Sequence, residues 1–254
     1  LINTGFLNAD SVLACDIDQV KLTEVEGRFG VRTSNDNVDA ARFADAVVIA
    51  VPPRNVLDVL KEIRASLSDS QILVSLAALI STSLIEETLQ MRIAVARVMP
   101  NIACLVGAGF NVYSFGRYMT PEGRKWTEEF LGALGVYRQI DEEKMEIYSI
   151  LSAMGPTYFL PFVDNLIKFG ENEGLSQEEA RIAVASTLGG TAQLISQTRR
   201  PVEEIKNLIG TQPLQKRERE LRTVLTEELS RTLQQMRSAK EKLDRTASRA
   251  GVKQ

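Results

Sequence analysis

The chain has 254 residues, which is enough for one large domain or two ordinary ones. Its apolar content of 44%, charged content of 25% and net charge of −3 are those of an ordinary soluble protein without electrostatic preference for nucleic acid or a membrane surface. The sequence has no histidine and no apolar run long enough for a membrane span, so we exclude His-based triads, His metal sites and membrane insertion, and expect no bound metal.

The first elements are short strands alternating with helices. Residues 1–5 have the pattern of a helix end with Gly5 as C-cap, so we expect the start of that helix, and the strand before it, to lie upstream of Leu1. Strands are then predicted at residues 12–15 and 31–33, and helices at residues 19–29 and 36–43.

The middle of the chain continues this alternation. The apolar run at residues 46–51 predicts a strand covered on both faces. An amphipathic helix is predicted next, at residues 54–67, and then a strand at 72–76. A capping box at 83–86 opens a further helix, and a strand follows at 93–99. Later strands are predicted at 110–115 and 136–140, with a helix between them that Thr120 and Pro121 open. A strand about every 20–25 residues predicts a doubly wound parallel sheet.

From residue 141 the periodicity is helical throughout. Breaks at residues 155–156, 174–176, 200–201 and 212–213 divide this part into successive helices. The last helix, at residues 214–247, is long and charged, and its apolar positions indicate a packing or oligomerisation helix. We therefore predict two domains, at residues 1–140 and 141–254.

Three predicted strands end where an open parallel sheet binds ligands. The first ends at Pro52 and Pro53, the second in the small residues 75–78, and the third at Pro100, followed by Asn101. Helix N-terminal N–H groups after Pro53 would favour an anion or a carbonyl. The small residues 75–78 suit either a flat ring or tight packing between helix and strand. We expect these loops to line one crevice.

Two polar residues of the first elements are further candidates. Asp16 follows the first strand, where an acid accepts hydrogen bonds from an adenosine ribose and disfavours a 2′-phosphate; the alternative is helix capping by Asp16 or Asp18. Asn37 is interpreted as a helix cap or as a contact to the adenine side of a cofactor. Cys15 and Cys104 are interpreted as buried structural thiols in a reducing cytoplasm.

Taken in order, these residues resemble the pyrroline-5-carboxylate reductase family. The resemblance rests on the Arg-Val-Met-Pro-Asn block at residues 97–101, on Ser-Leu-Ala-Ala at 75–78, on residues 46–53, and on Ser-Ala-Met-Gly-Pro-Thr-Tyr at 152–158. It implies an α/β Rossmann-type domain at residues 1–140, without its first strand and glycine-rich phosphate loop, and an all-α dimerisation domain at residues 141–254 that forms a homodimer.

The resemblance also implies an activity and a set of contacts. The activity is reduction of 1-pyrroline-5-carboxylate, or a related cyclic imine, to proline by NADPH or NADH in the cytoplasm. Because a protonated cyclic imine is already electrophilic, the tasks left to the protein are orientation and charge placement. The family pattern assigns cofactor contacts to Asn37, Ala50, Val51, Pro52 and Pro53, with Ala77 and Asn101 near the nicotinamide. Asp16 favours NAD.

Departures from the family pattern leave alternatives open. Pro52 stands where the family has a lysine, and residues 210–215 replace the family's Ser-Pro-Gly-Gly-Thr-Thr substrate loop, which leaves Thr211 as the catalytic candidate there. One alternative is a divergent paralogue, either non-catalytic or with another substrate, that binds a nucleotide or a protein partner. Another is a dehydrogenase of the same architecture that acts on a hydroxy acid or an arogenate-like compound.

Overall fold

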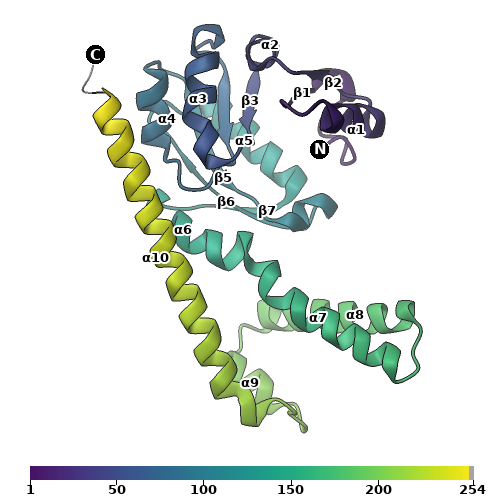
Figure 1. Ribbon diagram of the computed structural model, residues 1–254. Helices are drawn as coiled ribbons and strands as arrows, with labels where there is room; N and C mark the ends of the chain where they lie inside the picture. Colours follow the sequence, from purple (N-terminus) through teal and green to yellow (C-terminus); the bar gives the residue numbers. More distant parts are fainter. Residues whose placement is uncertain (252–254) are drawn as a thin grey trace. The chain divides into compact units, whose positions relative to one another are not determined.

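The computed structural model describes residues 1–251, without the side chains of residues 244 and 246–251 (Figure 1). Contacts divide the chain into two units, each described separately below. The first unit holds Leu1–Ala153 and the residues from Thr232 onward, and the second unit is Met154–Arg231. The predicted domain boundary after residue 140 stays a prediction.

The strands of the first unit form two sheets. β1 (Leu13–Cys15) and β2 (Arg32–Ser34) make a parallel pair. The larger sheet has the order β3-β4-β5-β6-β7, built from β3 (Ala46–Ile49), β4 (Ile72–Ser75), β5 (Ala94–Met99), β6 (Gly109–Phe115) and β7 (Gly135–Gln139). In Figure 1 the small sheet lies beside β3, at one end of the larger sheet.

The larger sheet is mostly parallel, which agrees with the predicted doubly wound parallel sheet, and β6 is the exception. β3, β4 and β5 are parallel, β6 is antiparallel to β5, and β7 is parallel to β6. The connection between β5 and β6 holds one short 3-10 helix, η3 (Ile102–Val106). A parallel return needs a crossover of a dozen residues or more, so this short loop sends β6 back in the opposite direction.

β3 corrects a second expectation, that its apolar run is covered on both faces. Val48, in the middle of β3, is 40% exposed. Among the described residues β3 is hydrogen-bonded to β4 alone, because β1 and β2 form their own sheet. The predicted upstream first strand stays a prediction.

Most helices of the first unit agree with the predicted ones. They are α1 (Gln19–Phe29), α2 (Asn37–Phe43), α3 (Pro53–Ile63), α4 (Thr82–Leu89), α5 (Pro121–Leu134) and α6 (Met145–Tyr148), which a π-helical turn continues (Ser149–Ala153). Residues 1–7 form turns, with Gly5 at φ +72° and a bond from the N–H of Phe6 to the carbonyl of Leu1. The predicted capping box is wrong: the N-cap of α4 is Ser81, whose hydroxyl accepts from the N–H of Leu84 at 3.2 Å.

Helices cover both faces of the larger sheet, as a doubly wound fold requires. On one face Ile49, Leu73 and Val95 pack against α3 and α4. On the other face Val74, Ala96 and Val98 pack against α5. Alternate side chains of one strand point to opposite faces, so β4 and β5 contribute to both clusters. Every residue of β5 is buried, which makes it the central strand.

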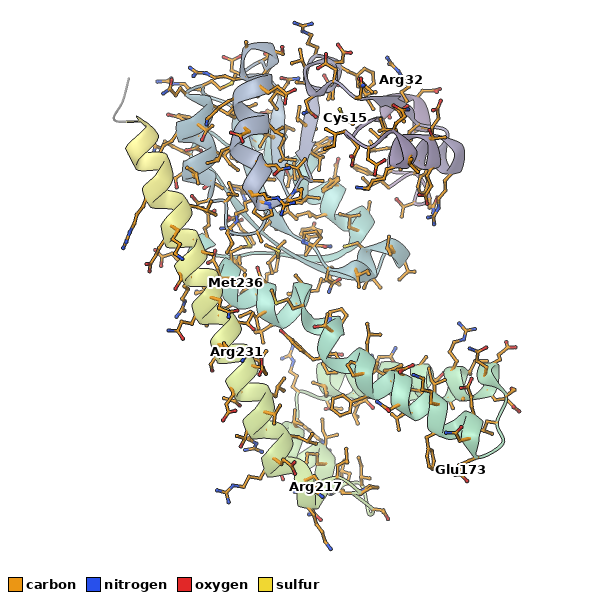
Figure 2. The ribbon with its side chains drawn as sticks, in the orientation of Figure 1. Cys15, Arg32, Glu173, Arg217, Arg231 and Met236 are labelled. Carbon is orange, nitrogen blue, oxygen red and sulfur yellow. The ribbon has the colours of Figure 1, made fainter. Side chains whose placement is uncertain are left out.

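The second unit is helical. It holds α7 (Gly155–Asn172), α8 (Gln177–Thr198), α9 (Val202–Asn207) and the first part of α10 (Glu218–Gly251). Ser176 and Glu179 form a capping box at the start of α8. The later part of α10 belongs to the first unit, where Met236 (labelled in Figure 2) is buried and Leu243 packs against the α3–α4 cluster. No described helix is long and apolar enough to span a membrane.

Candidate functional site

The carboxyl ends of three parallel strands lie level at one edge of the larger sheet. The register pairs Ile49 with Ser75 and Ser75 with Arg97. The chain therefore leaves β3 at Ala50, leaves β4 just before Ala77, and leaves β5 just before Asn101. Sequence-predicted residues that are up to 51 positions apart are thus brought to the same edge, which we call the carboxyl edge.

After β3 two prolines open a helix at this edge. Pro52 is the N-cap of α3 and Pro53 its first residue, and the carbonyl of Pro52 accepts from the N–H of Asn55 at 2.9 Å. Proline fits the first turn because the N–H groups there have no intrahelical partner. Ala50 and Pro52 are exposed and Val51 is half-buried, so this stretch is accessible.

After β4 the chain passes through Ala77 and then turns at Ala78 and Leu79. The Ala77 side chain is buried, and its N–H lies 3.4 Å from the hydroxyl of Ser75. Two residues later Leu79 has a φ of +70°, which is rare for a residue with a branched side chain. Such strain persists only where the surrounding structure imposes it, and it is frequent at ligand sites.

After β5 the carboxamide of Asn101 is held at both ends. Its Oδ1 accepts from the N–H of Ala103 at 3.2 Å, which makes Asn101 the N-cap of η3. Its Nδ2 lies 3.5 Å from the carbonyl oxygen of Ser152, in the π-helical turn after α6. The Ser152 hydroxyl donates to the carbonyl of Phe110 on β6 at 2.9 Å, so this turn is itself fixed to the sheet.

Asp16 directly follows β1, and the helix cap beside it is Asp18. The Asp18 side chain accepts from the N–H of Val20 at 2.9 Å, whereas Asp16 accepts from the N–H of Asp18 at 2.9 Å. The Asp16 side chain is 39% exposed, and its Oδ2 lies 3.9 Å from the Lys21 ammonium. A carboxylate in this position can still accept hydrogen bonds from a ligand.

Asn37 is not the cap of its helix. The cap of α2 is Asp36, which accepts from the N–H of Val38 at 2.8 Å. The Asn37 side chain instead donates to Glu62 Oε2 on α3 at 2.9 Å. The cap interpretation is therefore wrong, and the cofactor-contact interpretation stays a prediction.

Both cysteines are half-buried rather than buried. Cys15 lies on β1 (Figure 2), and burial, with nearby carboxylates, raises the pKa of its thiol. Burial also raises the pKa of Cys104, whose Sγ donates to Asn111 Oδ1 at 3.0 Å. Raised pKa values keep both side chains as unreactive thiols at neutral pH.

A buried charge cluster surrounds Arg97 and was not predicted from the sequence. The Arg97 side chain is fully buried; its Nη1 lies 3.1 Å from Glu142 Oε1 and its Nη2 lies 3.2 Å from Glu146 Oε1. Glu142 also accepts from the N–H of Thr82 at 2.9 Å and from its hydroxyl at 2.7 Å. A signal was present, since one arginine within an apolar strand must find carboxylate partners when the strand is buried.

Thr211 belongs to the second unit, and the other predicted site residues belong to the first. Its side chain is exposed in the loop between α9 and α10. In that loop Gln212 Nε2 donates to the carbonyls of Lys206 at 2.8 Å and Ile209 at 3.3 Å. Among the described residues no three Cys, Asp or Glu side chains form a group that could hold a metal ion.

Two family models match the chain. One is described as NADP oxidoreductase coenzyme F420-dependent and covers residues 1–79; the other is described as pyrroline-5-carboxylate reductase dimerisation and covers residues 142–212. Pyrroline-5-carboxylate reductase 1 of Bacillus subtilis is 30% identical over 178 residues, which are 70% of this chain and 60% of that protein. The match thus spans less than two thirds of this relative's length.

Two solved structures are similar over nearly the whole chain. A pyrroline-5-carboxylate reductase from Coxiella burnetii is 26% identical with a TM-score of 0.73, over 96% of this chain and 92% of that chain. The pyrroline carboxylate reductase of Plasmodium falciparum with NADP bound is 24% identical with a TM-score of 0.75, over 96% and 90%. The second likeness shows the fold alone.

Proposed function

Because the chain belongs to the pyrroline-5-carboxylate reductase family, we propose that it reduces 1-pyrroline-5-carboxylate, or a related cyclic imine, to proline with NADPH or NADH. The observation that carries the proposal is the level register of β3, β4 and β5, which brings the loops that hold Ala50, Ala77 and Asn101 to one edge of the sheet. In open α/β sheets ligands such as dinucleotides bind outside the carboxyl ends of the strands.

The residues of the carboxyl edge fit the nicotinamide end of a dinucleotide. Ala50 and Val51 follow β3 and are accessible, Ala77 follows β4, and Asn101 after β5 offers a carboxamide at the same edge of the sheet. The cofactor, when bound, supplies the hydride. The 254 residues contain no G-x-G-x-x-G loop between a strand and a helix, so the residues described here do not provide a pyrophosphate cradle.

The remaining residues receive proposed tasks according to their position. Asp16 and Asn37 would contact the adenosine part of the cofactor, and Pro52 and Pro53 would place the first turn of α3 beside it. Thr211 is the candidate hydroxyl for the substrate carboxylate. We propose a homodimer through the helices of the second unit, in line with the dimerisation model matched at residues 142–212.

An assay of both directions tests the activity. We expect the protein to oxidise NADPH or NADH when pyrroline-5-carboxylate is added, and to reduce NAD(P)⁺ with proline at high pH. Asn101→Ala removes the carboxamide at the carboxyl edge, and we expect kcat/KM to fall about 10- to 100-fold, the value of one hydrogen bond to a polar ligand group. Arg237→Met, an exposed change on α10, is the control and is expected to leave kcat/KM unchanged.

Cofactor binding, measured beside this turnover assay, distinguishes the alternatives. Cofactor binding without turnover of either substrate would favour the divergent paralogue, because residues 210–215 lack the glycine pair of the family's substrate loop. If neither NADPH nor NADH binds, the oxidoreductase proposal itself is wrong.

Asp16 gives a separate prediction about the choice of cofactor. A carboxylate hydrogen-bonds ribose hydroxyls and repels the 2′-phosphate of NADPH, so we expect a lower KM for NADH than for NADPH. Asp16→Ser should remove the repulsion and lower the KM for NADPH relative to that for NADH about tenfold, the effect of one charge contact of about 1.4 kcal/mol. An unchanged KM ratio would contradict the role of Asp16.

A further inference from the structure

The buried charge cluster at Arg97 is joined by a lysine from the far end of the chain. Glu146 Oε1 lies 3.2 Å from Arg97 Nη2 and 3.0 Å from the ammonium of Lys240 on α10. The Glu146 side chain is 6% exposed and that of Lys240 is 23% exposed. The later part of α10 is therefore attached to the first unit through a largely buried ion pair as well as through Met236 and Leu243.

Glu146 lies in the same stretch of helix as the group that holds Asn101. α6 begins at Met145 and passes without a break into the π-helical turn that ends at Ala153. The carbonyl of Ser152 in that turn accepts from the Asn101 carboxamide. Glu146 and the acceptor of Asn101 are therefore joined by one continuous helical stretch, residues 145–153.

The charge cluster contains one buried donor that none of the described carboxylates uses. Arg97 and Lys240 carry two positive charges, and Glu142 and Glu146 carry two negative ones, so the four side chains balance. Arg97 Nε is buried and has no hydrogen-bond partner among the described residues. Without Lys240 the Glu146 carboxylate can turn toward this free donor, and α6 would follow it.

We propose that Lys240 is a positioning residue for Asn101: it holds Glu146, and through α6 and the π-helical turn it fixes the Asn101 carboxamide for the nicotinamide cofactor. This inference rests on the proposed function, in which Asn101 contacts the cofactor. It gives the end of α10 a task at the carboxyl edge, although Lys240 lies 94 positions after Glu146 in the chain.

Binding of NADPH and NADH to Lys240→Met tests the proposal, measured by the fluorescence of the reduced nicotinamide. We expect the Kd of the preferred cofactor to rise about 5- to 20-fold, in the range of coupling between residues of one network. Lys240→Arg keeps the cation and should restore the wild-type Kd. Arg237→Met removes a positive charge one turn away on an exposed face and should bind as the wild type does.

Two further measurements separate positioning from loss of fold. The side-chain amide resonances of Asn101, assigned by their absence in Asn101→Asp, should shift in ligand-free Lys240→Met and stay in place in Arg237→Met. In a Glu146→Gln background Lys240→Met should weaken binding no further, since both act along one path. If Lys240→Met does not fold, Lys240→Gln, which keeps a hydrogen-bond donor beside Glu146, takes its place in the same measurements.

The outcomes are distinct. If the wild type binds the cofactor and Lys240→Met binds it equally well, or Lys240→Arg fails to restore binding, the positioning role is overturned and the proposed function stands. If the wild type binds neither NADPH nor NADH, both proposals are overturned.

Discussion

At the scale of single residues, the charge of Arg97 organises much of the first unit. A fully buried guanidinium needs carboxylates, and it receives Glu142 and Glu146 from the segment that follows β7. Glu142 in turn accepts from the first N–H of α4. One arginine on the central strand therefore fixes the positions of α4 and α6, which flank the loops at the carboxyl edge.

The pKa of Glu146 leads to a prediction about stability. Burial alone would raise this pKa, but the hydrogen bond from Lys240 and the charge of Arg97 outweigh burial and hold the pKa below its ordinary value of 4.5. A depressed carboxylate pKa stabilises the fold above the unfolded-state value and loses that contribution as the pH falls through the folded value. Glu146→Gln should therefore be about 3–5 kcal/mol less stable than the wild type at pH 7.

The difference between the two proteins should shrink as the pH falls below about 4.5, where Glu146 becomes protonated in the unfolded wild type and then in the folded one. Urea unfolding at pH 7, 5, 4 and 3 measures it. Glu143→Gln, an exposed change three positions away, should cost less than about 0.5 kcal/mol throughout. A Glu146→Gln difference that is as large at pH 3 as at pH 7 would contradict the assignment.

At the scale of elements, the sequence predicts well where local signals decide. α1 begins after Asp18 and ends at Gly30, whose φ of +66° suits a glycine C-cap, and α5 begins with the predicted Thr120 cap and Pro121. These signals act within one turn of the chain. The prediction for α4 was wrong by two residues, since Ser81 and not Ser83 caps the helix and both serines offer the same local signal. The bond from the first N–H of α4 to Glu142, 60 positions later, has no local signal at all.

The same distinction applies to the candidate site. That Ala77 and Asn101 follow strands could be predicted from the apolar runs and the prolines, because strand ends are local features. Three contacts could not be predicted, because each joins segments 25 or more positions apart. They are the bond from Asn37 to α3, the bond from Asn101 to the π-helical turn, and the link from Lys240 to Glu146. The tasks of these residues toward a ligand stay proposals.

At the scale of the whole molecule, the apolar side chains are distributed unequally between the two units. The first unit has two large buried clusters, one on each face of the sheet. In the second unit, among the described residues, the buried hydrophobic side chains are Ala180 and Ile205. Its helices instead expose many large apolar side chains, among them Phe159, Leu160, Phe162, Leu166, Phe169, Ile182, Leu188, Val224 and Leu225.

An exposed apolar surface of this kind is expected to be covered by another protein surface, and a second copy is the partner that the dimerisation model indicates. Phe162→Glu on α7, where the side chain is 52% exposed, should place a charge in that interface and weaken dimerisation at least about 30-fold, or 2 kcal/mol. Light scattering at micromolar concentration should then show a dimer for the wild type and a monomer for the variant. Val20→Glu, on α1 of the first unit and 77% exposed, should remain a dimer, because only the second unit is short of buried apolar surface. A monomeric wild type, or a dimeric Phe162→Glu, would show that the exposed face of α7 is not an interface between copies of this chain.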